Sequence, residues 1–143
     1  MGNREVVERF AEALAADDFD AQDALLHDDY VVYWPQSGET IRGRANRRAM
    51  LENYPGGVRS KADHIAGGED EYLTGPSWNV VHLTGSGDEI TVTGTIDYGD
   101  LGVWHFASLL TLRDGKIWRQ TDYFAAPFDA PAWRAQWVEV GDH

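Results

Sequence analysis

Residues 102–125 read GVWHFASLLTLRDGKIWRQTDYFA, and this stretch decides the fold class. Two segments of alternating side chains, 102–113 and 116–125, flank the dipeptide Asp114-Gly115. Alternation indicates strands, and Asp-Gly between two such segments is typical of a β-hairpin. The second half of the chain therefore predicts an antiparallel sheet.

Working outward, further strands are predicted over 30–34, 37–42, 61–66, 77–84 and 89–98, and helical spacing predicts helices over 3–16, 20–26 and 44–54. Helices first and a strand meander afterwards is the α+β arrangement, with helices on one face of the sheet. The 143 residues fit a single domain, 1–143. A tail from about residue 126, with a short helix expected within 128–138, closes one end of the sheet or meets a second subunit.

The composition excludes several classes of partner and chemistry. With 24 acidic and 12 basic residues the formal charge is −12, so nucleic acid and anionic membranes are repelled. No cysteine is present, which removes disulfides and thiolate chemistry. No signal core, membrane-length apolar run, nucleotide-binding loop or metal-ligand spacing is evident, so we expect a cytoplasmic protein without cofactor or metal.

Three short stretches carry a resemblance to a known family. They are Tyr33-Trp34-Pro35 followed by Ile41-Arg42-Gly43-Arg44, then Asp63-His64-Ile65-Ala66-Gly67-Gly68, and finally Asp114-Gly115-Lys116-Ile117 with Asp122-Tyr123-Phe124. In this order they resemble the nuclear transport factor 2-like (NTF2-like) superfamily, in particular SnoaL-like polyketide cyclases. The resemblance implies a cone-shaped α+β barrel: three N-terminal helices pack against a curved, mostly antiparallel sheet around a deep pocket for small apolar molecules. It also implies a homodimer.

The resemblance also suggests catalytic candidates. Asp97 and Asp122 look like the two strand acids of limonene epoxide hydrolases, and SnoaL-like cyclases use an acid near the position of Asp122. His64 lies in a segment similar to that of a catalytic histidine in scytalone dehydratase. Two usual residues are missing: Thr95 replaces an arginine of the epoxide hydrolases, and Trp34 replaces the general base of ketosteroid isomerases.

The residues themselves add to the case for Asp122. Alternation along the last strand puts Trp118, Gln120, Asp122 and Phe124 on one face. A carboxylate among apolar side chains resists ionisation and can act as a general acid or base near neutral pH. The alternative is a structural aspartate that accepts hydrogen bonds from the backbone or a tyrosine.

The other two candidates have equally ordinary alternatives. Asp97 follows Thr91, Thr93 and Thr95 on the polar face of its strand, so it can be a strand-end turn residue. His64, before the Gly67-Gly68 turn, can pass protons to a ligand or be a buried histidine satisfied by the backbone.

Aromatic and polar side chains at strand spacing are expected to line the pocket, although such aromatics are more often ordinary core. They are Tyr33, Trp34, Tyr54, Trp104, Phe106, Ser108, Trp118, Gln120 and Phe124.

The leading hypothesis is a cofactor-independent enzyme of cyclase, isomerase or dehydratase type, or a hydrolase like the epoxide hydrolases. It would move protons on a small apolar molecule bearing a carbonyl or hydroxyl group. The alternatives are a non-catalytic module that binds such a molecule and a dimeric protein-interaction domain.

Overall fold

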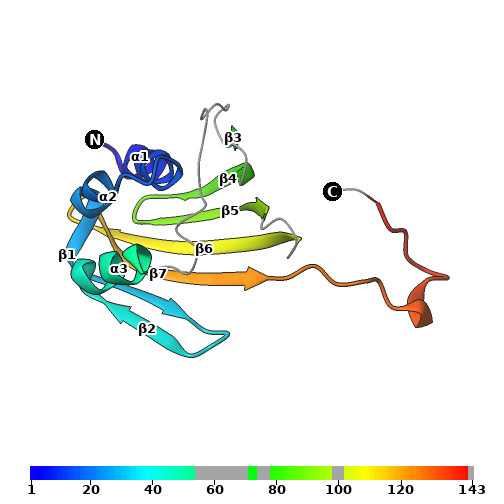
Figure 1. Cartoon of the computed structure of the whole chain (residues 1–143). Helices are drawn as coiled ribbons and strands as arrows, with labels where there is room; N and C mark the ends of the chain where they lie inside the picture. Colours follow the sequence, from blue (N-terminus) through cyan, green and yellow to red (C-terminus); the bar gives the residue numbers. More distant parts are fainter. Residues whose placement is uncertain (54–70, 74–77, 98–101, 142–143) are drawn as a thin grey trace.

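The structure is a computed structural model that describes residues 1–53, 71–73, 78–97 and 102–141. Figure 1 shows the helices gathered at one end of a long sheet, from which the C-terminal residues lead away. The helical elements are α1 (Asn3–Ala15), α2 (Phe19–Leu25), α3 (Gly43–Glu52) and the single 3-10 turn η2 (Ala132–Arg134). The strands are β1 (Leu26–Trp34), β2 (Glu39–Arg42), β3 (Glu71–Leu73), β4 (Trp78–Ser86), β5 (Glu89–Asp97), β6 (Val103–Arg113) and β7 (Lys116–Ala125).

The sheet confirms the predicted α+β class. Its strand order is β2-β1-β7-β6-β5-β4-β3, and every neighbouring pair is antiparallel except β1 and β7. The expected hairpin at Asp114-Gly115 joins β6 to β7. Among the described strands, the curved sheet is open and does not close into a barrel, and β2 and β3 are its two edges.

The parallel pairing of β1 with β7 is the part of the topology that the local sequence does not predict. Val32 of β1 is in register with Gln120 of β7, and Tyr33 with Thr121. A parallel neighbour needs a long connection, and here most of the chain lies between the two strands. The first strand is therefore held between β2 and the last strand of the domain.

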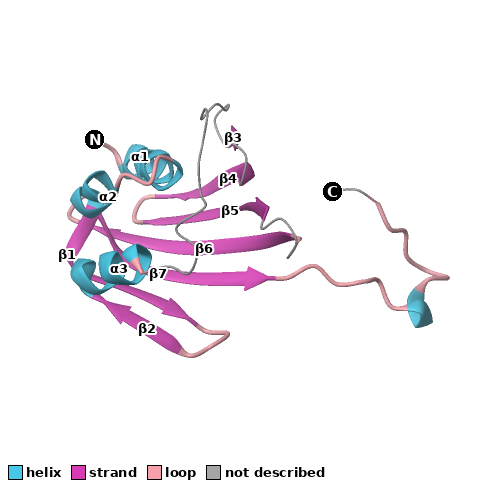
Figure 2. Ribbon diagram, viewed as in Figure 1, coloured by secondary structure: helices cyan, strands magenta, loops and turns pink. Residues whose placement is uncertain are grey.

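The core lies between the helices and one face of the sheet, which we call the inner face (Figure 2). Val6, Val7 and Phe10 form the apolar stripe of α1, and each is at most 3% exposed. They belong to one cluster with side chains of β1, β4, β5, β6 and β7: Leu26, Tyr30, Val32, Leu83, Ile90, Val92, Ile96, Phe106, Leu110, Leu112 and Ile117. The opposite, outer face carries no helix among the described residues.

The turn between β4 and β5 depends on a glycine. Gly85 has φ +108°, and a Cβ on it would collide with the carbonyl oxygen of Glu89. Only a residue without a side chain fits there. This glycine fixes the register in which β4 returns as β5.

The helices and strands match the sequence expectations with four exceptions. β3 was not expected, and β1 begins at Leu26, four residues before the expected start of that strand at residue 30. The strand expected over 61–66 lies outside the described residues. In the tail, the short helix expected within 128–138, with Trp133 and Trp137 on it, is a single 3-10 turn that ends at Arg134, before Trp137. Among the described residues, no helix is long and apolar enough to cross a membrane.

Candidate functional site

Asp122 lies on the inner face of β7, directly opposite Ser108 of β6. The residue is only 6% exposed, on a face that also carries apolar groups such as Phe106 and Phe124. Because burying an unpartnered carboxylate is very costly, its partners decide whether this position is tolerated.

A β-bulge sets which residues of β7 share this face. Ile117 pairs with Leu112 and Arg119 pairs with Thr111, so Trp118 is the extra residue between them. The extra residue interrupts the alternation, which brings fully buried Ile117 onto the same face as Gln120 and Asp122. Simple alternation along the whole strand would have placed Ile117 on the opposite face.

Three neutral side chains donate hydrogen bonds to the Asp122 carboxylate. Ser108 Oγ donates to Oδ1 at 2.7 Å, and Trp34 Nε1 donates to Oδ2 at 3.0 Å. Gln120 Nε2 lies 2.8 Å from Oδ1 and 3.1 Å from Oδ2. Since an ionised carboxylate only accepts hydrogen bonds, this set of donors fits the charged form.

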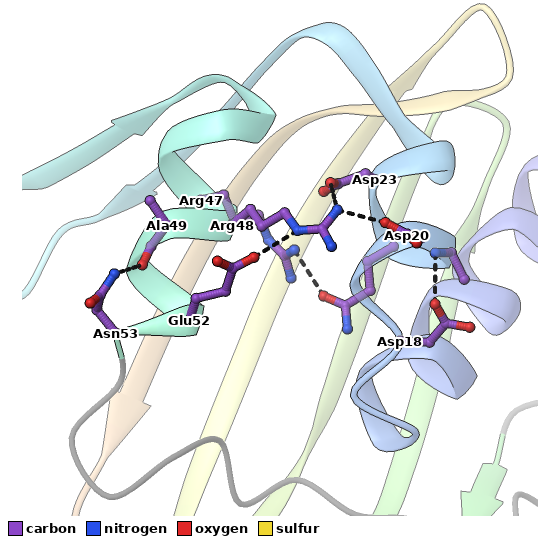
Figure 3. A network of polar contacts seen from close by, with 10 residues as sticks. Asp18, Asp20, Asp23, Arg47, Arg48, Ala49, Glu52 and Asn53 are labelled. Atoms are coloured by element: carbon purple, nitrogen blue, oxygen red, sulfur yellow. Dashed lines mark hydrogen bonds and ion pairs between the residues drawn. The ribbon is translucent and has the colours of Figure 1, made fainter.

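Behind Asp122 the polar contacts continue through buried side chains to the helices. The Tyr30 hydroxyl donates to Gln120 Oε1 at 2.7 Å. Arg47 of α3 acts on Tyr30 by charge and hydrogen bonding, and its Nη1 donates to Gln22 Oε1 at 2.9 Å. Figure 3 shows Arg47 reaching from α3 toward α2. Asp122 is thus linked to a buried cation through two neutral side chains.

The far end of this chain of contacts is also well supported. Gln22 Nε2 donates to the carbonyl oxygen of Ala13 at 3.0 Å, near the end of α1. The guanidinium of Arg47 lies 5.2 Å from the centre of the Phe10 ring, a cation–π contact. Arg47 and Gln22 are 7% and 1% exposed. Together these contacts satisfy a polar path that would otherwise destabilise the core.

Tyr30 is held neutral at the centre of the path. Burial raises the pKa of its hydroxyl above the ordinary value, an effect that the nearby Arg47 opposes and Asp122 reinforces. A neutral hydroxyl keeps its proton and so remains a donor to Gln120.

The structure brings together several of the residues expected at the site. Trp34, Ser108, Gln120 and Asp122 are joined by hydrogen bonds. Phe124 packs edge-on against Trp34, with 6.5 Å between ring centroids. By register, Phe106 and Trp104 lie on the same face of β6 as Ser108.

Other expected residues lie elsewhere, and the register explains why. Asp97 is exposed at the end of β5, on the face opposite the buried Ile96, so Asp97 and Asp122 do not share a site. Tyr33 alternates with Val32 and Trp34 and is 42% exposed. Trp118 is displaced by the bulge, and the guanidinium carbons of Arg113 and Arg119 lie 5.0 and 4.4 Å from the centre of its ring. His64 and Tyr54 lie outside the described residues.

Sequence reasoning missed Tyr30, Arg47 and Gln22 as parts of the polar path. Tyr30 could have been predicted, because it is two residues from Val32 and four from Trp34 and therefore lies on the same face of the strand. Arg47 lies one helical turn before Leu51, but an arginine in a helix is usually exposed, so its type argued against burial. Among the described residues, no group of three or more His, Asp or Glu side chains could hold a metal ion.

Comparisons with known proteins agree with this architecture. The model of the SnoaL-like domain matches residues 7–120. An NTF2-like protein of unknown function from Burkholderia xenovorans LB400 has 31% identity and a TM-score of 0.71, with 98% of this chain and 95% of that chain covered. No curated protein matches the chain.

Two further solved structures share the fold at lower identity. A ketosteroid isomerase-like protein from Kribbella flavida DSM 17836 has 23% identity and a TM-score of 0.75, covering 99% of this chain and 90% of that chain. TerC, co-crystallised with polyporic acid, has 23% identity and a TM-score of 0.62, covering 85% of this chain and 90% of that chain.

The fold and the matched residues define an NTF2-like protein, which confirms the resemblance seen in the sequence. Within that superfamily, the chain belongs to the SnoaL-like domain family.

Proposed function

We propose that this protein is a cofactor-independent enzyme that transfers a proton on a small apolar molecule bearing a carbonyl or hydroxyl group. Asp122 is the proposed general base or acid. The observation that carries the proposal is a 6% exposed carboxylate, fixed by three neutral donors, on a face with Phe106 and Phe124. Family membership supports an enzymatic or ligand-binding role of this kind.

The chemistry follows from the charge on Asp122. The carboxylate takes a proton from a carbon next to the substrate carbonyl, so a C–H bond breaks and an O–H bond forms. The electron pair moves to the carbonyl oxygen and gives an enolate, and return of the proton to another carbon completes an isomerisation. In dehydration the enolate instead expels a hydroxyl group from the next carbon, and Asp122 gives its proton to the departing oxygen, so that water leaves. In cyclisation the enolate carbon attacks a second carbonyl, whose oxygen takes the proton from Asp122.

Access to Asp122 requires one of its donors to give way, because each carboxylate oxygen already accepts two contacts. Trp34 is the proposed movable donor. Its indole is half-buried and packs on the half-buried ring of Phe124, whereas Gln120 is tied to Tyr30. We therefore propose that ligand lies beside Trp34 and Phe124.

The same hydrogen bonds favour a second candidate, a non-catalytic module that binds small apolar ligands. In that role Asp122 is an acceptor that orients its neighbours and never exchanges a proton. TerC, a structural neighbour, was co-crystallised with polyporic acid, which supports this candidate.

Hydrogen–deuterium exchange distinguishes the two candidates. In D2O, with 2-tetralone as the probe, the enzyme hypothesis predicts that the C–H groups next to the carbonyl exchange faster than in buffer alone, as followed by NMR. Asp122→Asn should lower the catalysed rate by about 100-fold or more, because a general base contributes 10²–10⁴-fold. Asp122→Glu, which keeps the carboxylate, should lose less.

Asp29→Asn, the same change at an exposed position of β1, is the matched control. Asp97→Asn should also keep the exchange rate, because Asp97 lies on the other face of the sheet. A folded Asp122→Asn protein with the wild-type exchange rate would falsify the enzymatic assignment. A probe that raises Tm without any catalysed exchange would support the binding module instead.

The large apolar side chains that remain exposed lead us to propose that the chain acts as a homodimer. Phe128, Trp133, Trp137 and Val140 are each more than 70% exposed. Such a concentration of exposed apolar groups is typical of an interaction surface.

A further inference from the structure

The C-terminal tail, residues 126–141, leads away from the end of β7 and from the rest of the sheet (Figures 1 and 2). All its residues are exposed except Pro131 and Arg134, which are half-buried. Its largest side chains are Phe128, Trp133 and Trp137, which are 81%, 75% and 73% exposed. A free, solvated tail is normally polar, so this one has the composition of a segment that binds something.

The tail has a defined exit and a defined shape. A Cβ on Gly102 would lie 3.0 Å from Pro127, so the first turn of the tail passes closely over the start of β6. Further along, Ala135 N donates to Ala132 O and Trp137 N donates to Arg134 O. The NTF2-like protein from Burkholderia xenovorans LB400 covers 98% of this chain, leaving at most about three of 143 residues, so its structure includes most of the tail.

The outer face of the sheet offers a matching apolar surface. Tyr33, Leu109 and Tyr123 surround Thr121, because Thr121 pairs with Tyr33 on β1 and with Leu109 on β6, and Tyr123 is two residues further along β7. Their exposed fractions are 42%, 46% and 45%. Among the described residues of the chain, no helix lies over this face.

The charges of the two surfaces are complementary. Arg113, Lys116 and Arg119 are exposed around the β6–β7 turn together with one acid, Asp114, which leaves a net charge of +2. The tail, residues 126–141, carries Asp129 and Glu139 against one basic residue, Arg134, for a net charge of −1. In a chain with net charge −12, a basic patch beside an apolar one favours an acidic, aromatic segment.

We propose that the tail docks on the outer face of a second copy of this chain, around Thr121, and that the partner's tail docks reciprocally. The proposal rests on the proposed homodimer but not on the chemistry of Asp122. Sixteen residues extend to about 55 Å at most, whereas β1, β7 and β6 span only about 10 Å between outer strand axes, so reach is not limiting. Reciprocal docking gives a two-fold dimer in which both apolar surfaces are covered.

Sedimentation equilibrium on the full chain tests the surfaces. Wild type should be a dimer at micromolar concentration, and the double variant Trp133→Ser/Trp137→Ser should dissociate with a Kd at least about tenfold higher, because buried tryptophans dominate interfaces. Leu109→Ser/Tyr123→Ser, on the receiving face, should weaken the dimer similarly. Gln136→Ser, a polar change within the same tail, is the matched control and should leave the Kd unchanged.

Cross-linking tests whether the tail of one chain contacts the outer face of another. The chain has no cysteine, so each introduced thiol is unique. Gln136→Cys and Thr121→Cys proteins, mixed and treated with a bismaleimide, should give a cross-linked pair in higher yield than either protein alone. Placed in one chain, the two substitutions should give cross-links between chains.

Three results would overturn the proposal. A monomeric wild type would remove both the homodimer and the docking. If the dimer survives the tail substitutions, or if cross-links form only within a single chain, the docking proposal fails, whereas the homodimer proposal does not.

Discussion

At the scale of single residues, Asp122 shows how a charged group is accommodated in an apolar setting. Its oxygens accept hydrogen bonds from Ser108, Trp34 and Gln120, and the buried cation in the path, Arg47, is reached through Gln120 and Tyr30. A direct Arg–Asp pair would fix both groups at higher desolvation cost. Because Gln120 and Tyr30 lie between them, the Asp122 carboxylate does not form an ion pair with Arg47.

Tyr30→Phe tests this path and gives a pH-dependent prediction. Loss of the hydroxyl leaves Gln120 Oε1 without its donor, which should cost about 1–3 kcal/mol of unfolding free energy at pH 7. Burial raises the pKa of Tyr30, so above about pH 10 the unfolded chain ionises this group first and the wild type loses stability. The difference in unfolding free energy between wild type and Tyr30→Phe should therefore narrow by about 1.4 kcal/mol per pH unit above 10.

Urea unfolding from pH 7 to pH 11 measures this gap. Gln136→Ser, an uncharged change at an exposed position, is the control and should show a constant difference from wild type. A gap for Tyr30→Phe that stayed constant over the whole range would contradict the burial argument.

Predictions for single residues were correct where the two-residue alternation of a regular strand decides which face of the sheet a side chain occupies. The family resemblance and alternation both pointed to Asp122, alternation pointed to Gln120 and Ser108, and the structure joins the three. Trp118 was placed by alternation, but it is the extra residue of the bulge, which depends on the pairing with β6 and has no signal in the sequence of β7 alone. Arg47 was missed because its burial depends on Gln22 and Phe10, which are far away in sequence.

At the scale of elements, α3 holds two adjacent arginines with opposite roles. Arg47 points into the polar path, whereas Arg48 bonds Asp20 and Asp23 of α2 and Glu52 of its own helix at 2.7 to 3.2 Å (Figure 3). These acidic groups raise the pKa of Arg48, Asp20 most of all. Both arginines tie α3 to α2, one through the core and one across the surface.

Arg47→Met and Arg48→Met form a matched pair of substitutions. Arg47→Met should cost about 3 kcal/mol, because Gln22 and Tyr30 lose a buried partner. Arg48→Met should cost clearly less, and its effect should shrink in 1 M NaCl because exposed ion pairs are screened. Urea unfolding at low and high salt measures both, and equal losses at both positions would contradict the assigned roles.

The elements themselves were largely predictable because each has a strong local signal. Helical spacing gave α1 and α3 within two residues at each end, and the Asp114-Gly115 turn gave the β6–β7 hairpin. The parallel pairing of β1 with β7 was not predictable, since it joins segments that share no local signal. The tail misled for a similar reason: Trp133 and Trp137 have helical spacing, but only Ala132–Arg134 is helical.

At the scale of the whole molecule, folding and association are expected to be linked. The core cluster contains no residue after Phe124, so the tail contributes nothing to the described core of its own chain. If tails bind across two copies, dimer formation stabilises the folded state by mass action. The Tm of wild type should then rise with protein concentration.

Differential scanning calorimetry between about 5 and 200 μM measures this linkage. The Tm of Trp133→Ser/Trp137→Ser should stay nearly constant over that range, and Gln136→Ser should follow wild type. A wild-type Tm independent of concentration would show that association and folding are not coupled.

The pairing of β1 with β7 has a consequence for how the protein is made. Trp34 and Asp122, which meet across this pair, are 88 positions apart, so a ribosome must complete nearly the whole polypeptide before β1 gains its second neighbour. Until then β1 can pair only with β2, and its other edge is free to recruit strands from other nascent chains. Slow, late closure and a need for chaperone protection during synthesis follow from the position of one strand.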